Sequence, residues 1–139
     1  MEKRNLGNTG TKVGALGIGA MSFSDFYGPT NTQESHAILK MALDNGIDHI
    51  DTAKVYGMGL SEERIGQFLN TLNPKDRQFF KIATKGGIDR KNFDDKGTVV
   101  FDNSKEFLTE ELNNSLRRLG VDCVELYYVH RREADRPIE

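Results

Sequence analysis

The stretch Asn45-Gly46-Ile47-Asp48-His49-Ile50-Asp51 decides the fold class of this 139-residue chain. Asn45-Gly46 is typical of a helix C-terminus, where the backbone turns left-handed. The short run that follows is rich in isoleucine and predicts a buried strand ending at Asp51. A helix signal precedes this stretch and another follows it, so we expect strands and helices to alternate along the chain.

Both flanking helices have recognisable start and stop signals. Asn31-Thr32-Gln33-Glu34 has the spacing of a capping box. The residues expected on the apolar face of that first helix are Ile38, Met41, Ala42 and Asn45. We expect Ser61 to open the second helix and Pro74 to end it. Its expected apolar face consists of Ile65, Phe68, Leu69 and Leu72.

The remaining elements complete one pattern. Residues 3–6 and 12–13 predict a small hairpin, and residues 16–19, 79–84 and 123–129 predict further strands. A long polar connection leads to a third helix, which begins at Ser104, is closed by Gly120 and carries its apolar face at Phe107, Leu108, Leu112, Leu116 and Leu119. The order is a hairpin followed by β-α-β-α-β-α-β, which favours a parallel α/β sheet.

Length limits how much of such a fold the chain can hold. A complete (β/α)₈ barrel needs about 200 residues, whereas the predicted strands recur every 32 to 43 residues and leave room for four βα units. We therefore expect one domain, residues 1–139, with four parallel strands.

Composition excludes several classes of protein. The chain has 19 Lys and Arg against 21 Asp and Glu, a net charge of −2, so we expect no nucleic-acid partner and no membrane-surface patch. Cys123 is the only cysteine, which predicts a reducing, cytoplasmic location. The polar N-terminus and the lack of a long apolar run predict neither a signal peptide nor a membrane span.

Familiar cofactor and metal motifs do not fit. Gly17-x-Gly19 lacks the third glycine of a dinucleotide fingerprint, and Lys85-Gly86-Gly87 has the wrong order for a phosphate-binding P-loop. The three scattered histidines and the single cysteine, which we expect to be buried, have no metal-ligand spacing. We expect no metal site.

Four side chains with proton-transfer chemistry follow the predicted strands. Asp51, Lys85 and His130 stand where three successive strands end, and Tyr56 lies five residues after Asp51. The carboxyl ends of parallel strands meet at one edge of the sheet, so we expect these residues to converge. Taken singly, each has a plainer reading as a capping acid, a solvated lysine, a structural histidine or a packing tyrosine.

Together these residues make a coherent proton donor. A free tyrosine has a pKa of about 10, and an ammonium within ~4–6 Å lowers such a pKa by about 1–3 units. Lys85 would supply the ammonium to Tyr56, and Asp51 would hold it in place. His130 would orient a carbonyl oxygen or relay the proton.

The chain resembles the NADP-dependent aldo/keto reductases in four regions that keep the family's order and spacing. The matching segments are Gly17-Ile18-Gly19-Ala20-Met21, Ile50-Asp51-Thr52-Ala53-Lys54-Val55-Tyr56-Gly57 continuing into Ser61-Glu62-Glu63-Arg64-Ile65-Gly66, Ile82-Ala83-Thr84-Lys85-Gly86-Gly87, and Leu126-Tyr127-Tyr128-Val129-His130-Arg131.

The resemblance implies a (β/α)₈ TIM-type barrel, of which this chain holds the first four strands and the N-terminal hairpin that plugs its bottom. It also implies hydride transfer from NADPH to an aldehyde or ketone. Tyr56 would be the general acid, Lys85 and Asp51 its tuning pair and His130 the substrate-orienting residue. Ala20 and Met21, with Asp51, would approach the nicotinamide.

The segment 21–29 adds aromatic residues beyond the first strand. We expect Phe23 and Tyr27 to contact substrate together with Tyr56 and His130, although a self-packed surface loop is an equal reading. With residues 137–139, this segment looks most like the branch that reduces aldehydes, ketones or pyridoxal with broad tolerance. This sequence departs from the family's usual pattern at two places. Lys54 stands where relatives often carry an acid, a difference that we expect to alter only surface charge. Arg132-Glu133 stands where relatives more usually have an apolar residue followed by Asp.

Half a barrel would have two unpaired sheet edges. By the resemblance, it would also lack the phosphate-binding loops that follow the seventh and eighth strands. The chain could be an oxidoreductase completed by self-association or by a complementary C-terminal half, a non-catalytic truncated fragment, or a binding module that kept only the fold.

Overall fold

The computed structural model of the chain describes residues 1–93 and 97–137. A parallel sheet forms its centre, with strands β3 (Gly17–Gly19), β4 (His49–Asp51), β5 (Lys81–Gly86) and β8 (Leu126–Val129) in that spatial order. Ile18, Ile50 and Ile82 lie side by side across β3, β4 and β5. The predicted order of four parallel strands is therefore confirmed, although β8 begins at Leu126 and the preceding Cys123 is exposed, not buried.

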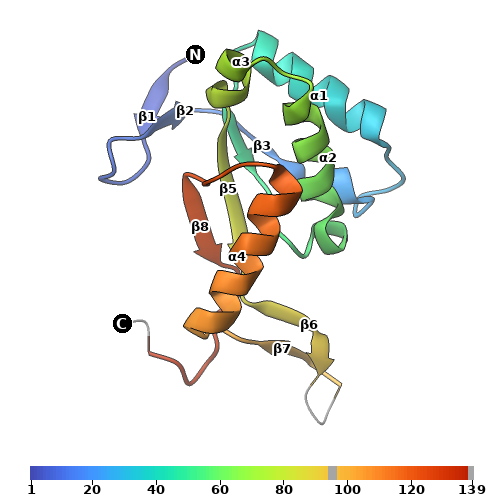
Figure 1. The fold of residues 1–139 in the computed structure, drawn as a ribbon, viewed down its shortest axis with the longest axis vertical. Helices are drawn as coiled ribbons and strands as arrows, with labels where there is room; N and C mark the ends of the chain where they lie inside the picture. Colours follow the sequence, from blue (N-terminus) through green and yellow to red (C-terminus); the bar gives the residue numbers. More distant parts are fainter. Residues whose placement is uncertain (94–96, 138–139) are drawn as a thin grey trace.

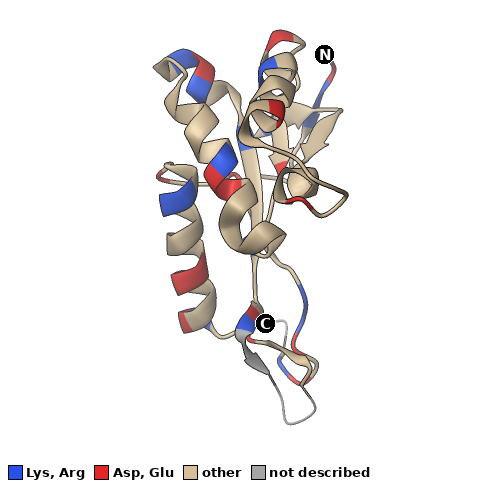
Figure 2. Cartoon of the chain, turned by 90° about the vertical axis from the view of Figure 1, so that its right-hand side faces the viewer, with Lys and Arg blue, Asp and Glu red and all other residues tan. Residues whose placement is uncertain are grey.

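Helices α1 (Thr32–Asp44), α2 (Leu60–Asn70) and α4 (Lys105–Leu119) connect these strands (Figure 1). α2 packs against both α1 and α4. The core lies between the helices and the sheet, where Leu39, Ile50, Ile65, Leu69 and Leu119 are fully buried. Acidic and basic residues are interspersed over the chain in Figure 2, as the near-neutral charge predicts.

The N-terminal hairpin, β1 (Lys3–Asn5) and β2 (Lys12–Gly14), forms as expected. Asp48, just before β4, ties it to the sheet by accepting hydrogen bonds from the Lys3 ammonium at 2.5 Å and the Gly14 amide at 2.6 Å. Burial raises the pKa of Asp48, but these two donors outweigh it and hold the pKa below its usual value. The hairpin is thus fastened by a buried carboxylate.

α1 begins with the predicted capping box. The Asn31 side chain accepts from the Glu34 amide at 2.9 Å, and the Glu34 carboxylate accepts from the Asn31 amide at 3.3 Å. The predicted apolar face is only partly right, because Ala42 is buried whereas Ile38 and Met41 are 46% and 67% exposed. The buried stripe runs through Ser35, Leu39 and Ala42, and Ser35 tolerates burial because its hydroxyl donates to the Asn31 carbonyl.

The ends of α2 also differ from the expectation. The helix begins at Leu60 after Gly59, whose φ is +106°, and Ser61 is a buried packing residue instead of a cap. Its hydroxyl donates to the Ala20 carbonyl at 2.8 Å and lies 2.9 Å from the Thr52 hydroxyl. Pro74 does not end α2, which stops at Asn70; it opens a separate short helix, α3 (Pro74–Phe79), at a position where its missing N–H costs nothing.

A second hairpin occupies the segment that the sequence indicated only as a polar connection. Strand β6 (Ile88–Phe93) pairs antiparallel with β7 (Val99–Phe101), with Ile88 opposite Phe101. The charged residues of this segment hid the strand pattern. The two hairpins lie at opposite ends of the sheet (Figure 1), and β6–β7 follows the carboxyl end of β5.

α4 has the predicted Ser104 cap and Gly120 stop. Only part of its predicted apolar face is buried, since Leu119 is fully covered while Phe107, Leu108, Leu112 and Leu116 are partly exposed. At the buried end, α2 and α4 approach closely, and a Cβ at Gly66 would collide with the Arg118 carbonyl. In residues 1–93 and 97–137, no helix has the length and apolar character needed to cross a membrane.

Lys54 does more than alter surface charge, which corrects that expectation. Its side chain is buried, and its ammonium lies 2.9 Å from Oε1 of the equally buried Glu111 on α4. A second ion pair joins the partly exposed Arg118 of α4 to the buried Glu62 of α2 at 2.7 Å, and Glu62 also accepts from the Thr84 hydroxyl at 2.6 Å. Ion pairs therefore connect α4 with the segment after β4 and with α2, and a hydrogen bond extends the second pair to β5.

We predict that Lys54→Met lowers the free energy of unfolding by about 3–5 kcal/mol, because it leaves the Glu111 carboxylate buried without its cation. The double variant Lys54→Met/Glu111→Leu should recover most of that loss. Urea unfolding followed by circular dichroism measures both. Lys40→Met, which breaks an exposed pair with Asp44, serves as the control and should change stability by less than about 1 kcal/mol. Equal effects of Lys54→Met and Lys40→Met would contradict the account.

Candidate active site

The four residues expected at the sheet edge do meet there. Asp51 ends β4, Lys85 lies in β5, Tyr56 begins the short 3₁₀ helix η2 (Tyr56–Gly59), and His130 follows β8. Parallel pairing places Asp51 opposite Ala83, so Lys85, two residues further on, extends past the end of β4.

Lys85 is the centre of the cluster. Its ammonium donates to Asp51 Oδ1, to the Thr52 carbonyl at 2.7 Å and to the Tyr56 hydroxyl at 3.5 Å. The three donors of an ammonium are thereby directed to three acceptors. The lysine side chain is largely buried, while Asp51 is about one-third exposed.

Tyr56 and His130 stand edge to face. Their ring centroids are 5.9 Å apart with an interplanar angle of 86°, and Lys85 Nζ lies 5.1 Å from the centroid of the tyrosine ring. The His130 amide donates to the Gly86 carbonyl at 2.8 Å, which fixes the histidine beside β5. The buried His130 Nδ1 has no hydrogen-bond partner among the described residues.

His130 is disposed to remain neutral. Burial is the main cause that lowers its pKa below the usual value, and the positive charges of Lys85 and Arg131 lower it further, against a smaller opposing effect of Asp51. A neutral imidazole carries one donor and one acceptor nitrogen, so it can both donate to and accept from groups placed beside Tyr56.

The backbone after Tyr56 makes an unusual turn. Gly57 and Met58 have φ values of +64° and +56°, and Met58 is a non-glycine residue in the left-handed region. Such a conformation is costly for a side chain with a Cβ. A Cβ at Gly57 would lie 2.8 Å from Ser24 Cβ, so the turn packs closely against the 3₁₀ helix η1 (Ala20–Ser24).

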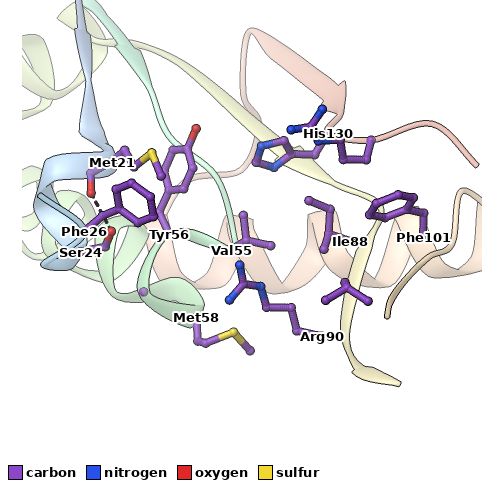
Figure 3. A pocket seen from close by; sticks show the side chains of 13 residues that line it. Met21, Ser24, Phe26, Val55, Tyr56, Met58, Ile88, Arg90, Phe101 and His130 are labelled. Carbon is purple, nitrogen blue, oxygen red and sulfur yellow. Dashed lines mark hydrogen bonds between the residues drawn. The ribbon is translucent and has the colours of Figure 1, made fainter. Parts of the chain in front are cut away.

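An open cavity of about 520 Å³ adjoins Tyr56 and His130. Figure 3 shows the side chains around it, which come from η1 and the loop after it, the η2 turn, the β6–β7 hairpin and the segment after β8. This volume is within the range of small-molecule sites. Among its lining residues are Met21, Tyr56, His130, Ile88, Arg90 and Phe101.

The cavity corrects some predicted contacts. Phe23 is buried in the core and does not face the cavity, because η1 turns its side chain inward against α2. Ala20 is fully buried, and its carbonyl accepts from the Ser61 hydroxyl. Tyr27 is exposed outside the lining and packs edge to face against Phe26. Met21 lines the cavity, and its contact with a nicotinamide stays a prediction.

Sequence reasoning missed several lining residues. Phe26, and not its neighbour Tyr27, lines the cavity, and Ile88, Arg90 and Phe101 lie on the β6–β7 hairpin. The short run of β-branched and aromatic residues Val99-Val100-Phe101 is the one sequence signal for that hairpin. No group of three His, Cys, Asp or Glu side chains in the described part of the chain is arranged to hold a metal ion.

Comparison with known proteins gives a consistent result. The profile of the Aldo/keto reductase family matches residues 15–139. An aldo-keto reductase of Schizosaccharomyces pombe, whose name specifies NADP(+), is 35% identical over 136 residues, covering 98% of this chain and 38% of that protein. A probable voltage-gated potassium channel subunit beta of Arabidopsis thaliana is 34% identical, covering 100% of this chain and 40% of its own length.

Solved structures give the same family as the sequence comparisons. An aldo-keto reductase from Bacillus halodurans in its holo form superposes with a TM-score of 0.81 at 35% identity, covering 99% of this chain and 43% of that one. The chain thus spans about two-fifths of the length of the relatives it matches.

We predict that Lys85→Met raises the pKa of His130, because it removes a positive charge that lowers this pKa. Asp51→Asn should lower the pKa, because the Asp51 carboxylate raises it. NMR titration of the imidazole protons measures both, and an unchanged His130 pKa in Lys85→Met would contradict the geometry.

The lowered pKa of His130 also makes the stability of the folded chain depend on pH. The folded chain binds the His130 proton more weakly than the unfolded chain does, so this residue's contribution to stability should decline as the pH falls below about 6.5.

Proposed function

The chain belongs to the aldo/keto reductase family, and on that premise we propose that its site reduces aldehydes or ketones to alcohols with NADPH. The observation that carries the proposal is the Lys85 ammonium, which contacts both the Asp51 carboxylate and the hydroxyl of Tyr56, a residue that lines an open cavity. An ammonium beside a phenol stabilises the phenolate that remains after proton donation.

Each residue of the cluster around Lys85 has a role in this proposal. Tyr56 donates its proton to the carbonyl oxygen, and Lys85 stabilises the developing phenolate. Asp51 and the Thr52 carbonyl keep the ammonium in place. The neutral His130 ring, edge to face with Tyr56, hydrogen-bonds the carbonyl oxygen and orients it.

The residues around the site fit the reactive end of the cofactor. Met21, Tyr56 and His130 line the same open cavity, and the buried His130 Nδ1 has no described partner, so a polar group can be received there. When bound, NADPH would supply the hydride that the carbonyl carbon accepts. With the proton from Tyr56, that hydride completes the alcohol.

A second candidate is a non-catalytic half-barrel that associates with a second copy or with a complementary chain. It is favoured by the outer side of β8, which pairs with no strand in residues 1–93 and 97–137, and by a groove beside it. That groove of about 790 Å³ is lined in part by Leu108 and Leu112 of α4 with Tyr127 and Val129 of β8. In this candidate the partner supplies the strands that would cover the groove.

We predict that Tyr56→Phe reduces aldehyde-dependent NADPH oxidation at least about 100-fold, the usual contribution of a general acid. Cofactor binding, followed by NADPH fluorescence, should change little. Tyr128→Phe is the matched control, because the Tyr128 ring also lies near Lys85, at 5.8 Å from its ammonium, but outside the cavity lining; it should retain activity.

The wild-type chain decides between the two candidates. If NADPH fluorescence shows no saturable change and no aldehyde-dependent NADPH oxidation is detected, the reductase proposal is wrong for this chain. A light-scattering mass above that of one chain, together with those two negative results, would favour the associating fragment.

A further inference from the structure

The charged side chains that line the cavity beside Tyr56 are of one sign, positive. Arg90 of β6 and Arg131, which follows His130, are among its lining residues, and no Asp or Glu is. Figure 3 shows the Arg90 side chain extending from the hairpin toward Val55, on the side of the cavity away from His130. The cavity therefore has a proton-donating end at Tyr56 and His130 and a cationic group at some distance from it.

These two arginines are not neutralised from within the structure. Among residues 1–93 and 97–137, neither guanidinium belongs to an ion pair, whereas Lys85 is paired with Asp51 and Arg136 with Glu133. The positive charge of Arg131 also acts on the site electrostatically, because it helps to lower the pKa of His130. An anionic ligand would meet a positive potential in this cavity.

Large apolar side chains surround the same cavity and remain uncovered. Phe26, Met58 and Phe101 are 64%, 53% and 38% exposed, and all three line it. Exposed apolar side chains gathered around one cavity indicate a binding surface more than isolated ones do. A ligand with an apolar middle would remove their surface from water.

We infer that the substrate of this site is a carbonyl compound that also carries a carboxylate, joined by an apolar body such as an aromatic ring. This inference rests on the proposed reduction of a carbonyl. The carbonyl group lies at Tyr56 and His130, the apolar body against Phe26, Met58 and Phe101, and the carboxylate at Arg90. A guanidinium suits this role because it binds a carboxylate through two parallel hydrogen bonds.

The test compares two ligands of nearly equal shape, para-carboxybenzaldehyde and the neutral para-formylbenzamide, by calorimetric titration of the chain without cofactor. We expect the wild type to bind the carboxylate about 5- to 10-fold more tightly, as a partly exposed charge-assisted pair allows. Arg90→Met keeps the apolar stem and should abolish this preference. Arg136→Met removes an arginine outside the cavity lining and should preserve it.

A further arm separates the two sources of an anionic group. Titration with ADP tests whether Arg90 serves a nucleotide phosphate: ADP binding that Arg90→Met weakens, with equal affinity for the two aldehydes, would overturn the proposal. Equal affinity for the two aldehydes in the wild type, or no binding of either, would also overturn it. Because no cofactor is present, a chain that shows the carboxylate preference but no NADPH oxidation would contradict the proposed reduction alone.

Discussion

The contact of the Lys85 ammonium with Asp51, Thr52 and Tyr56 is the interaction on which the site depends. It joins β5 to the end of β4 and to the η2 turn. Parallel register makes the contact possible, because Lys85 stands two residues beyond the partner of Asp51. A largely buried ammonium requires nearby acceptors, and all three of these lie at the carboxyl edge of the sheet.

The segment from Asp51 to Tyr56 serves two sides of the molecule. Asp51 and Tyr56 contact Lys85 through their side chains, whereas the side chains of Thr52 and Lys54 are buried in the packing behind the site. Thr52 meets the Ser61 hydroxyl, which in turn holds the Ala20 carbonyl, and Lys54 pairs with Glu111 on α4. The position of the Tyr56 ring is thus set by α2 and α4 as well as by the strands.

Features governed by neighbouring residues could be predicted from the sequence. The capping box at Asn31, the Gly120 stop and the placement of Asp51 and Lys85 at strand ends follow from local chemistry and from the parallel topology. Features decided by tertiary packing could not. The exposure of Ile38, the burial of Lys54 and the inward turn of Phe23 depend on which helix lies opposite. The β6–β7 hairpin, and Arg90 with it, was hidden by its charged composition.

A double-mutant cycle between Asp51→Asn and Lys85→Met tests the central claim most directly. The free energy of unfolding is measured by urea titration for the wild type, both single variants and the double variant. If the Lys85 ammonium organises the site, the two substitutions should be coupled by at least about 1 kcal/mol, as expected for a charge-assisted hydrogen bond between contacting residues. Effects that add to within about 0.3 kcal/mol would show that the two groups act independently and would contradict the account.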